Sequence, residues 1–159
     1  MRLSEILSAQ RILVDPSCAR IRGKMDALHH LAELLSPAIG VERSLVEALL
    51  SEREQLQSTG IGDGVAIPHT AVEEAESQAA ALILCPKGVE FEAIDGQPVT
   101  IIFGVVGPKR ATGEHLRTLA RISRLLRDPA TRARLIAAPN AQAAHDLISQ
   151  HDASTEVKA

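Results

Sequence analysis

The chain has 159 residues, 45% of them hydrophobic, and a formal net charge of −3. This is enough for a single domain with its own core, but two Phe and no Tyr or Trp provide no aromatic platform for stacking bases, so we expect no nucleic acid partner. The start of the chain resembles no signal peptide and no apolar run reaches membrane-spanning length, which predicts a cytoplasmic protein without stable membrane insertion.

The first third of the chain is predicted to be mainly helical. A short helix and a strand precede two longer helices, at residues 5–8, 11–14, 24–35 and 41–55. Pro37 and Gly40 are expected to end the first longer helix, because proline disrupts a helix interior and glycine favours its C-terminal end. In the second, Arg53 continues the row of Leu45 and Leu49 at i+4 spacing. We therefore expect the Arg53 side chain to point partly inward near the helix end.

The middle third predicts the strands of a sheet. Four segments read as strands, at residues 65–67, 79–85, 89–93 and 99–106. The second and fourth are continuous apolar runs, typical of strands buried on both faces, whereas the third alternates apolar with acidic residues, as a half-exposed strand does. Turns are expected at residues 86–88 and at Asp95–Gly96.

The last third returns to helices. They are expected at residues 113–127, 129–137 and 141–150, and residues 151–159 are expected to form a disordered C-terminal tail. Asp128 followed by Pro129 is typical of a helix start. Because helices and buried strands interleave, we predict an α/β domain over residues 1–150, with a mixed β-sheet flanked by helices.

A glycine-rich stretch in the middle of the chain is its most distinctive feature. Residues 58–69 read STGIGDGVAIPH and end at His69. Glycines let the backbone approach a partner closely, residues 65–67 read as a buried strand, and Pro68 favours extended geometry in the residue before it. We therefore expect His69 to lie at the end of a strand, beside a polar loop, as the candidate functional residue.

Four further polar residues complete a candidate site. His115 is expected in the first turn of a helix, where unpaired N–H groups favour anions. Arg53 offers forked donors to phosphate oxygens, and Ser58 and Thr59 add hydroxyl groups. If these side chains converge, they predict a phosphoryl-binding pocket in which the neutral imidazole of His69 attacks phosphorus. From residue types alone, a histidine with a purely structural role at a strand end remains open. No GxxxxGK[ST] motif is present, so nucleotide binding is not indicated.

The run from Arg53 to His69, RExxxSTGIGxGVAIPH, resembles the signature of the enzyme IIA proteins of the bacterial phosphotransferase system. Residues 91–99 (FxAIDGxPV) and 115–119 (HLxxL) resemble later motifs of its mannitol/fructose-type superfamily. The whole chain is most similar to the nitrogen-regulatory branch. The resemblance implies the fold of that superfamily, a mixed sheet flanked by helices in one EIIA type-2 domain.

The resemblance also implies roles and partners. In this family the histidine of the Ile-Pro-His motif accepts a phosphoryl group, which assigns tele-phosphorylation to His69; His115 and Arg53 match the second histidine and the arginine of the family's site. The implied donor is an HPr/NPr-like phosphocarrier protein. The implied recipient is a regulated transporter, kinase or enzyme, or an enzyme IIB. Neither a metal nor another cofactor is implied. Thr70 and Ala71 depart from the glycine and basic residue usual in the nitrogen branch, which bears on partner selectivity or on local loop geometry.

Several functional readings remain open. A freestanding chain favours a regulatory relay, whose output is its phosphorylation state, and the alternative is a fructose/mannitol-type sugar-transport IIA component that passes phosphate to an enzyme IIB. A binding module that docks on targets with His69 as its switch is compatible with either. A metal hydrolase using His69 and His115 lacks HExxH or comparable spacing. Cys18 and Cys85 form no metal-ligand pair and are expected to be buried apolar residues.

Overall fold

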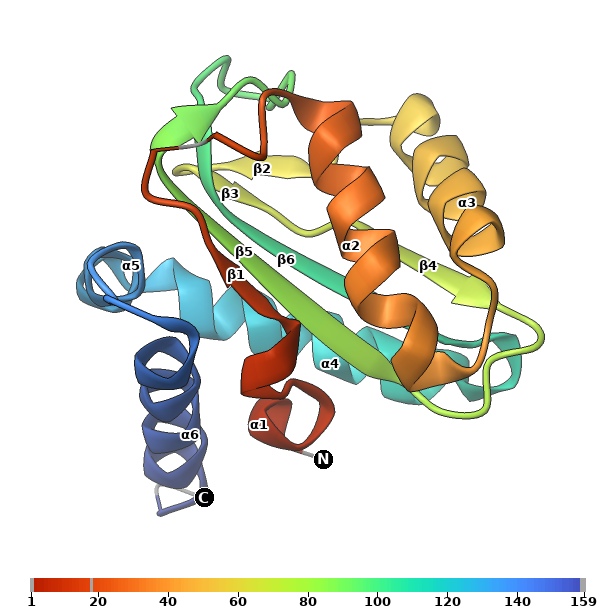
Figure 1. Ribbon diagram of the computed structural model, residues 1–159. Coiled ribbons are helices and arrows are strands. Elements are labelled where there is room, and N and C mark those ends of the chain that lie inside the picture. Colours follow the sequence, from red (N-terminus) through yellow and green to blue (C-terminus); the bar gives the residue numbers. More distant parts are fainter. Residues whose placement is uncertain (1, 18, 158–159) are drawn as a thin grey trace.

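One mixed β-sheet forms the centre of the protein and has helices on both faces (Figure 1). The computed structural model describes residues 2–17 and 19–157, without the side chains of residues 155–157. Cys18 lies outside the described residues, whereas Cys85 is buried, as expected. The strands are β1 (Ile12–Val14), β2 (Gly60–Gly62), β3 (Val65–Ala66), β4 (His69–Val72), β5 (Ala79–Val89) and β6 (Val99–Pro108).

The two long strands β5 and β6 pair antiparallel at the middle of the sheet. The strand order is β1-β5-β6-β3-β2, and β4 pairs with β6 as well. Both β3 and β4 run parallel to β6: β3 lies beside Ile101–Ile102, and β4 lies farther along, beside residues 105–108. β1 is parallel to β5. The predicted mixed sheet flanked by helices is therefore confirmed.

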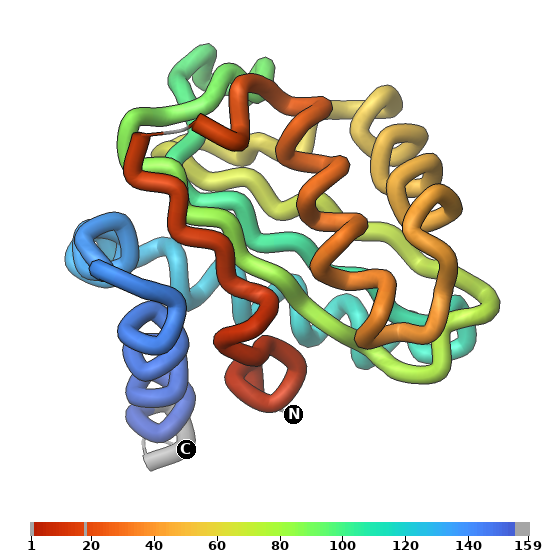
Figure 2. Tube along the Cα trace, viewed as in Figure 1, coloured from red at the N-terminus to blue at the C-terminus, as the bar shows by residue number. Residues whose placement is uncertain are grey.

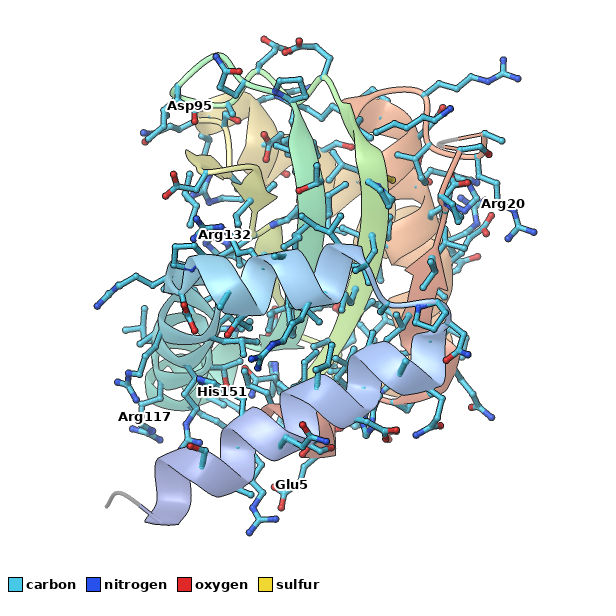
Figure 3. All side chains as sticks on the ribbon, turned by 90° about the vertical axis from the view of Figure 1, so that its left-hand side faces the viewer. Glu5, Arg20, Asp95, Arg117, Arg132 and His151 are labelled. Carbon is cyan, nitrogen blue, oxygen red and sulfur yellow. The ribbon has the colours of Figure 1, made fainter. Side chains whose placement is uncertain are left out.

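The helices form two groups. They are α1 (Leu3–Ile6), α2 (Lys24–Ile39), α3 (Arg43–Leu56), α4 (Thr112–Arg127), α5 (Pro129–Ile136) and α6 (Ala141–Val157), with 3-10 turns at Ala9–Arg11 and Lys109–Ala111. In Figure 1, α2 and α3 lie side by side on one face of the sheet, and α4 crosses behind it. Figure 3 looks onto the molecule from the side where α5 and α6 lie in front of the strands.

Each face of the sheet has its own apolar core. Along β5, Ile83 and Cys85 contact the core under α2 and α3, whereas Leu82 and Leu84 contact the core under α1, α4, α5 and α6. Successive side chains of a strand point to opposite faces. A strand covered on both faces must therefore be apolar throughout, which explains why β5 and β6 appear in the sequence as continuous apolar runs.

The first longer helix extends beyond the predicted end at residue 35. α2 includes Pro37 and ends at Ile39, with Gly40 in the left-handed conformation (φ 68°) directly after it. Ile39 is fully buried in the core under α2 and α3. Proline removes only one intrahelical hydrogen bond near the helix end, and burial of Ile39 compensates. Gly40, not Pro37, marks the end of this helix.

The last helix also extends beyond its predicted end at residue 150. α6 continues to Val157 and includes most of the segment expected to be a disordered tail. Its C-terminal half is fixed by Asp152, which is buried and accepts hydrogen bonds from the main-chain N–H groups of Leu3 and Ser4 and from the Ser4 hydroxyl, at 3.3, 2.9 and 2.7 Å. Figure 2 shows the first and last helices side by side. This contact spans almost the whole chain, so local sequence patterns do not reveal it.

The segment between β5 and β6 differs in detail from prediction. Residues 86–88, expected as a turn, lie within an irregular part of β5, and only Val89 of the predicted strand 89–93 is in a strand. The alternating burial of residues 89–93 is nevertheless as predicted, and so is the turn at Asp95–Gly96. Within residues 2–17 and 19–157, no helix combines the length and apolar character needed to cross a membrane.

Candidate functional site

His69 is the first residue of β4, not the end of the preceding strand as predicted. The backbone passes from β3 to β4 along the same edge of β6, so that His69 lies opposite Val105. Pro68 separates the two short strands because it has no N–H to donate to the sheet. Its carbonyl still accepts a hydrogen bond of 3.0 Å from the Val105 N–H. The imidazole is thus attached to a rigid edge of the sheet, and it is half-buried.

A hydrogen bond fixes the tautomer of His69. Its Nδ1 lies 2.6 Å from the main-chain oxygen of Ile67. A carbonyl oxygen can only accept, so Nδ1 carries the proton and donates it. In the neutral ring Nε2 then has the lone pair. This tautomer, assigned from the hydrogen bond, makes Nε2 the nucleophilic atom of the ring.

His115 lies beside His69, as the sequence predicts. It belongs to the first turn of α4, and the centroids of the two rings are 5.8 Å apart with an interplanar angle of 49°. The Nδ1 atom of His115 is buried and has no hydrogen-bond partner among the described residues. Buried polar atoms are almost always paired in a resting protein. This side chain therefore has hydrogen-bonding capacity that the protein itself does not use.

Both rings are kept neutral by their surroundings. Burial lowers the pKa of His69; its hydrogen bond to Ile67 and the charge of Glu54 oppose this effect, while the positive charge of Arg53 adds to it. Burial also lowers the pKa of His115, and the proximity of His69 lowers it further. Removal of an imidazole from water disfavours its charged form. Near neutral pH, the His69 ring is therefore neutral, and Nε2 keeps its lone pair.

Arg53 lies in the last turn of α3, and its charge acts on His69. The side chain is half-buried, as predicted. Nη1 donates a 3.0 Å hydrogen bond to the main-chain oxygen of Gln57. A guanidinium has five N–H donors, so most of its donors have no partner among the described residues and remain for another group. A doubly charged phosphoryl group beside His69 would be such a group.

The hydroxyl groups of Ser58 and Thr59 form hydrogen bonds within the protein. The Ser58 hydroxyl donates to the main-chain oxygen of Phe91 at 3.1 Å, and the Thr59 hydroxyl donates to Glu54 at 2.6 Å. A hydroxyl has one proton to donate, and a phosphoryl oxygen needs a donor. In this structure both protons are used within the protein, and a phosphoryl-binding role of Ser58 and Thr59 stays a prediction.

The glycine-rich loop packs closely on the segment that follows β5. A Cβ built on Gly60 would lie 2.8 Å from the Cβ and 2.9 Å from the Cα of Ala93. Gly64 has a φ of 77°, and its carbonyl accepts from the N–H groups of Thr100 and Ile101, at 2.8 and 3.0 Å. Glycine is therefore required at position 60 for close approach and at position 64 for its backbone conformation.

Two charged residues near the site were not predicted. Glu54 is buried and contacts Thr59, and its Oε1 lies 3.1 Å from Nζ of Lys24. The only signal for Glu54 in the sequence was its place next to Arg53 in the signature. Lys24, thirty positions earlier, gave no signal. Within the described part of the chain, no group of three or more His, Cys, Asp or Glu side chains is placed to hold a metal ion.

The sequence and structure both match known proteins. The family described as phosphoenolpyruvate-dependent sugar phosphotransferase system, EIIA 2, matches residues 5–151. The chain is 33% identical over 149 residues to the nitrogen regulatory protein of Bradyrhizobium diazoefficiens. This alignment covers 94% of this chain and 95% of that protein. It is 32% identical over 154 residues to the fructose-specific EIIABC component of Bacillus subtilis, covering 96% of this chain and 24% of that protein.

A solved structure extends the match to three dimensions. The nitrogen regulatory protein IIA-Ntr of Neisseria meningitidis superposes with a TM-score of 0.84 at 31% identity, over 91% of this chain and 97% of that one. The family match covers nearly the whole chain and includes His69 and His115. The chain belongs to the enzyme IIA family, type 2, of the phosphoenolpyruvate-dependent sugar phosphotransferase system.

Proposed function

We propose that this protein is a cytoplasmic phosphohistidine relay that accepts a phosphoryl group on Nε2 of His69 from an HPr/NPr-like phosphocarrier and regulates target proteins through its phosphorylation state. The observation that supports this proposal most directly is the 2.6 Å hydrogen bond from Nδ1 of His69 to the main-chain oxygen of Ile67. That bond leaves Nε2 as the nucleophile, beside a second imidazole with an unpartnered buried nitrogen.

The transfer needs no proton movement on His69. The lone pair of Nε2 attacks phosphorus, the bond between phosphorus and the carrier's histidine nitrogen breaks, and that nitrogen leaves with the electron pair. Nδ1 keeps its proton and its bond to Ile67 throughout. Positioning and charge stabilisation dominate phosphoryl transfer. We assign these roles to Arg53 and His115, as hydrogen-bond donors to the equatorial oxygens.

The direct test is phosphorylation by a phosphorylated HPr-type carrier. Wild-type protein should form an adduct that is labile in acid and stable in base, and His69→Ala should form none. The matched control is His151→Ala, because His151 lies on α6 (Figure 3), outside the site. His115→Ala should fold normally, as checked by circular dichroism, but accept phosphate more slowly. Labelling of His69→Ala at the wild-type level would refute the proposal.

The regulatory output follows from the charge of the product. A phosphoryl group adds roughly −1.5 to −2 charges near pH 7, enough to change an interface around His69. The nitrogen regulatory relatives support this output. A target that binds His69→Ala but not His69→Asp would fit a phosphorylation switch, and equal binding of the two variants would count against it.

A sugar-transport component is the second candidate. The fructose-specific EIIABC component of B. subtilis matches this chain over 24% of its own length, and its name includes a B component; in this candidate function an enzyme IIB is the next acceptor. Phosphorylated protein mixed with a fructose-type or mannitol-type enzyme IIB separates the two candidates. Rapid transfer to enzyme IIB supports transport, and retention of the phosphoryl group supports the regulatory role.

A further inference from the structure

A buried carboxylate lies one residue from Arg53, and the transfer mechanism above does not use it. The side chain of Glu54 is only 4% exposed. Its two oxygens accept from the main-chain N–H of Thr59 at 3.0 and 3.1 Å, and Oε2 also accepts from the Thr59 hydroxyl at 2.6 Å. Burial of a charge is costly unless the charge is paired and hydrogen-bonded. Three hydrogen bonds therefore link Glu54 to Thr59, a residue of the glycine-rich loop.

Thr59 connects this carboxylate to the candidate nucleophile through the main chain. The carbonyl of Thr59 accepts a 3.0 Å hydrogen bond from the N–H of Ile67. The carbonyl of Ile67 in turn accepts the 2.6 Å bond from Nδ1 of His69. Both main-chain polar groups of Thr59 are thus engaged, one by Glu54 and the other by Ile67. A displacement of Thr59 would move the carbonyl that selects the tautomer of His69.

Lys24 forms an ion pair with the same carboxylate. Its ammonium lies 3.1 Å from Oε1 of Glu54 and 5.4 Å from the centroid of the Phe91 ring. Its second ion pair, at 3.5 Å from Glu92, involves a side chain that is 80% exposed, and such pairs contribute little. The pair with Glu54 joins the start of α2 to the end of α3.

The residue type at position 54 also fits this arrangement. Every partner of the carboxylate is a hydrogen-bond donor: an ammonium, an N–H and a hydroxyl. An ionised carboxylate is acceptor-only, whereas an amide directs two N–H donors from one of its ends. The side-chain N–H groups of a glutamine at position 54 would therefore face groups that are themselves donors. Such a side chain could not accept hydrogen bonds from Lys24 and Thr59 together.

We infer that Glu54 is a positioning residue, which fixes the main chain of Thr59 and, through the carbonyl of Ile67, the orientation and tautomer of His69, with Lys24 holding the carboxylate in place. Its effect on phosphoryl transfer rests on the proposed function. Its effect on the His69 ring does not, because the ring can be observed in protein that has never met a carrier.

The test compares Glu54→Gln with Glu52→Gln, a matched change at an exposed glutamate two residues away on α3. The first measurement is the ¹⁵N spectrum of the His69 ring, which distinguishes a protonated Nδ1 from a protonated Nε2. Wild type and Glu52→Gln should show only the tautomer with the proton on Nδ1, and Glu54→Gln should show both tautomers. The second measurement is the initial rate of phosphoryl acceptance. It should fall about 10- to 100-fold in Glu54→Gln, as expected for a misplaced reacting group.

Two further variants separate positioning from stability. The double variant Lys24→Met/Glu54→Gln removes both charges of the pair; it should regain stability to denaturant relative to Glu54→Gln but keep the mixed tautomers and the slow transfer. Glu54→Asp keeps the charge but shortens the reach to Thr59 by one methylene, and it provides the same measurements if Glu54→Gln does not fold.

Each result either supports or overturns the positioning role of Glu54. A single His69 tautomer and a transfer rate within twofold of wild type in a folded Glu54 variant would overturn it, whatever the loss of stability. Mixed tautomers together with slow transfer would support it. Mixed tautomers in a protein whose wild type accepts no phosphate would support the positioning role and refute the proposed function.

Discussion

Gly60→Ala should both destabilise the protein and slow its phosphorylation. The added Cβ would lie 2.8 Å from the Cβ of Ala93 and 2.9 Å from its Cα. Ordinary carbon contacts are about 3.5–4.0 Å, so the two segments must separate by roughly 1 Å. Overpacking that forces such a shift lowers the free energy of unfolding by about 1–3 kcal/mol. The neighbouring Thr59 should shift with Gly60, and misplacement on this scale slows transfer by about 10- to 100-fold.

Denaturant unfolding measures the first effect, and the initial rate of labelling by a phosphorylated HPr-type carrier measures the second. Gly23→Ser is the control. It also adds a Cβ, but a Cβ at Gly23 meets nothing within 4 Å, and serine is favoured at the helix N-cap position that Gly23 occupies. If Gly60→Ala unfolds and reacts like wild type, the loop is not held by its contact with Ala93, and the geometric argument is refuted.

Three further predictions follow from individual contacts. Thr59→Val removes the hydroxyl that donates 2.6 Å to buried Glu54 and should lower the free energy of unfolding by about 1.5–3 kcal/mol; a loss too small to measure by denaturant titration would contradict that bond. Because burial and Arg53 lower the pKa of His69, an NMR titration should find its midpoint below the usual value of about 6.5, and Arg53→Gln should raise it. The unfolded chain then binds more protons at His69 than the folded protein does. The contribution of His69 to stability therefore falls as pH drops below the pKa of the unfolded state, and it levels off below the pKa of the folded state. A titration midpoint at or above the usual value would contradict this. Asp128→Ala removes the side chain that caps α5 through the Ala130 N–H and should cost about 1 kcal/mol of stability without changing the rate of phosphorylation.

Features that depend on local pattern were predicted well from sequence. The long strands β5 and β6 were visible because strands covered on both faces must be apolar throughout. The start of α5 was visible because Asp128 and Pro129 are suited to a helix N-terminus. The pairing of His69 with His115 came from a resemblance to known proteins and is seen in the ring contact of 5.8 Å.

Features that depend on distant partners could not be predicted from sequence. β4 forms because residues 69–72 pair with residues 105–108 of β6, and no local pattern distinguishes these four residues as a strand. The C-terminal half of α6 is held by contacts between Asp152 and Ser4. Glu54 is buried because Lys24 and Thr59 satisfy it; from sequence, a glutamate near a helix end reads as exposed.

The hydroxyl groups illustrate a second limit. Residue type shows that Ser58 and Thr59 each have one hydroxyl proton to donate, but it does not show whether that proton is already used within the protein. In the folded protein those protons go to Phe91 and Glu54. Arg53 differs because a guanidinium has more donors than the single bond to Gln57 uses. The hydrogen bonds that a side chain already makes in the folded protein are therefore not visible from its residue type.

The most direct test of the central claim is the position of the phosphoryl group on the phosphorylated protein. Protein labelled with ¹⁵N in its histidine rings and phosphorylated by an HPr-type carrier can be examined by NMR for coupling between ³¹P and each ring nitrogen. The bond from Nδ1 of His69 to Ile67 predicts coupling to Nε2 of His69, with Nδ1 still protonated. Phosphorus on Nδ1 of His69, or on another histidine, would contradict the account.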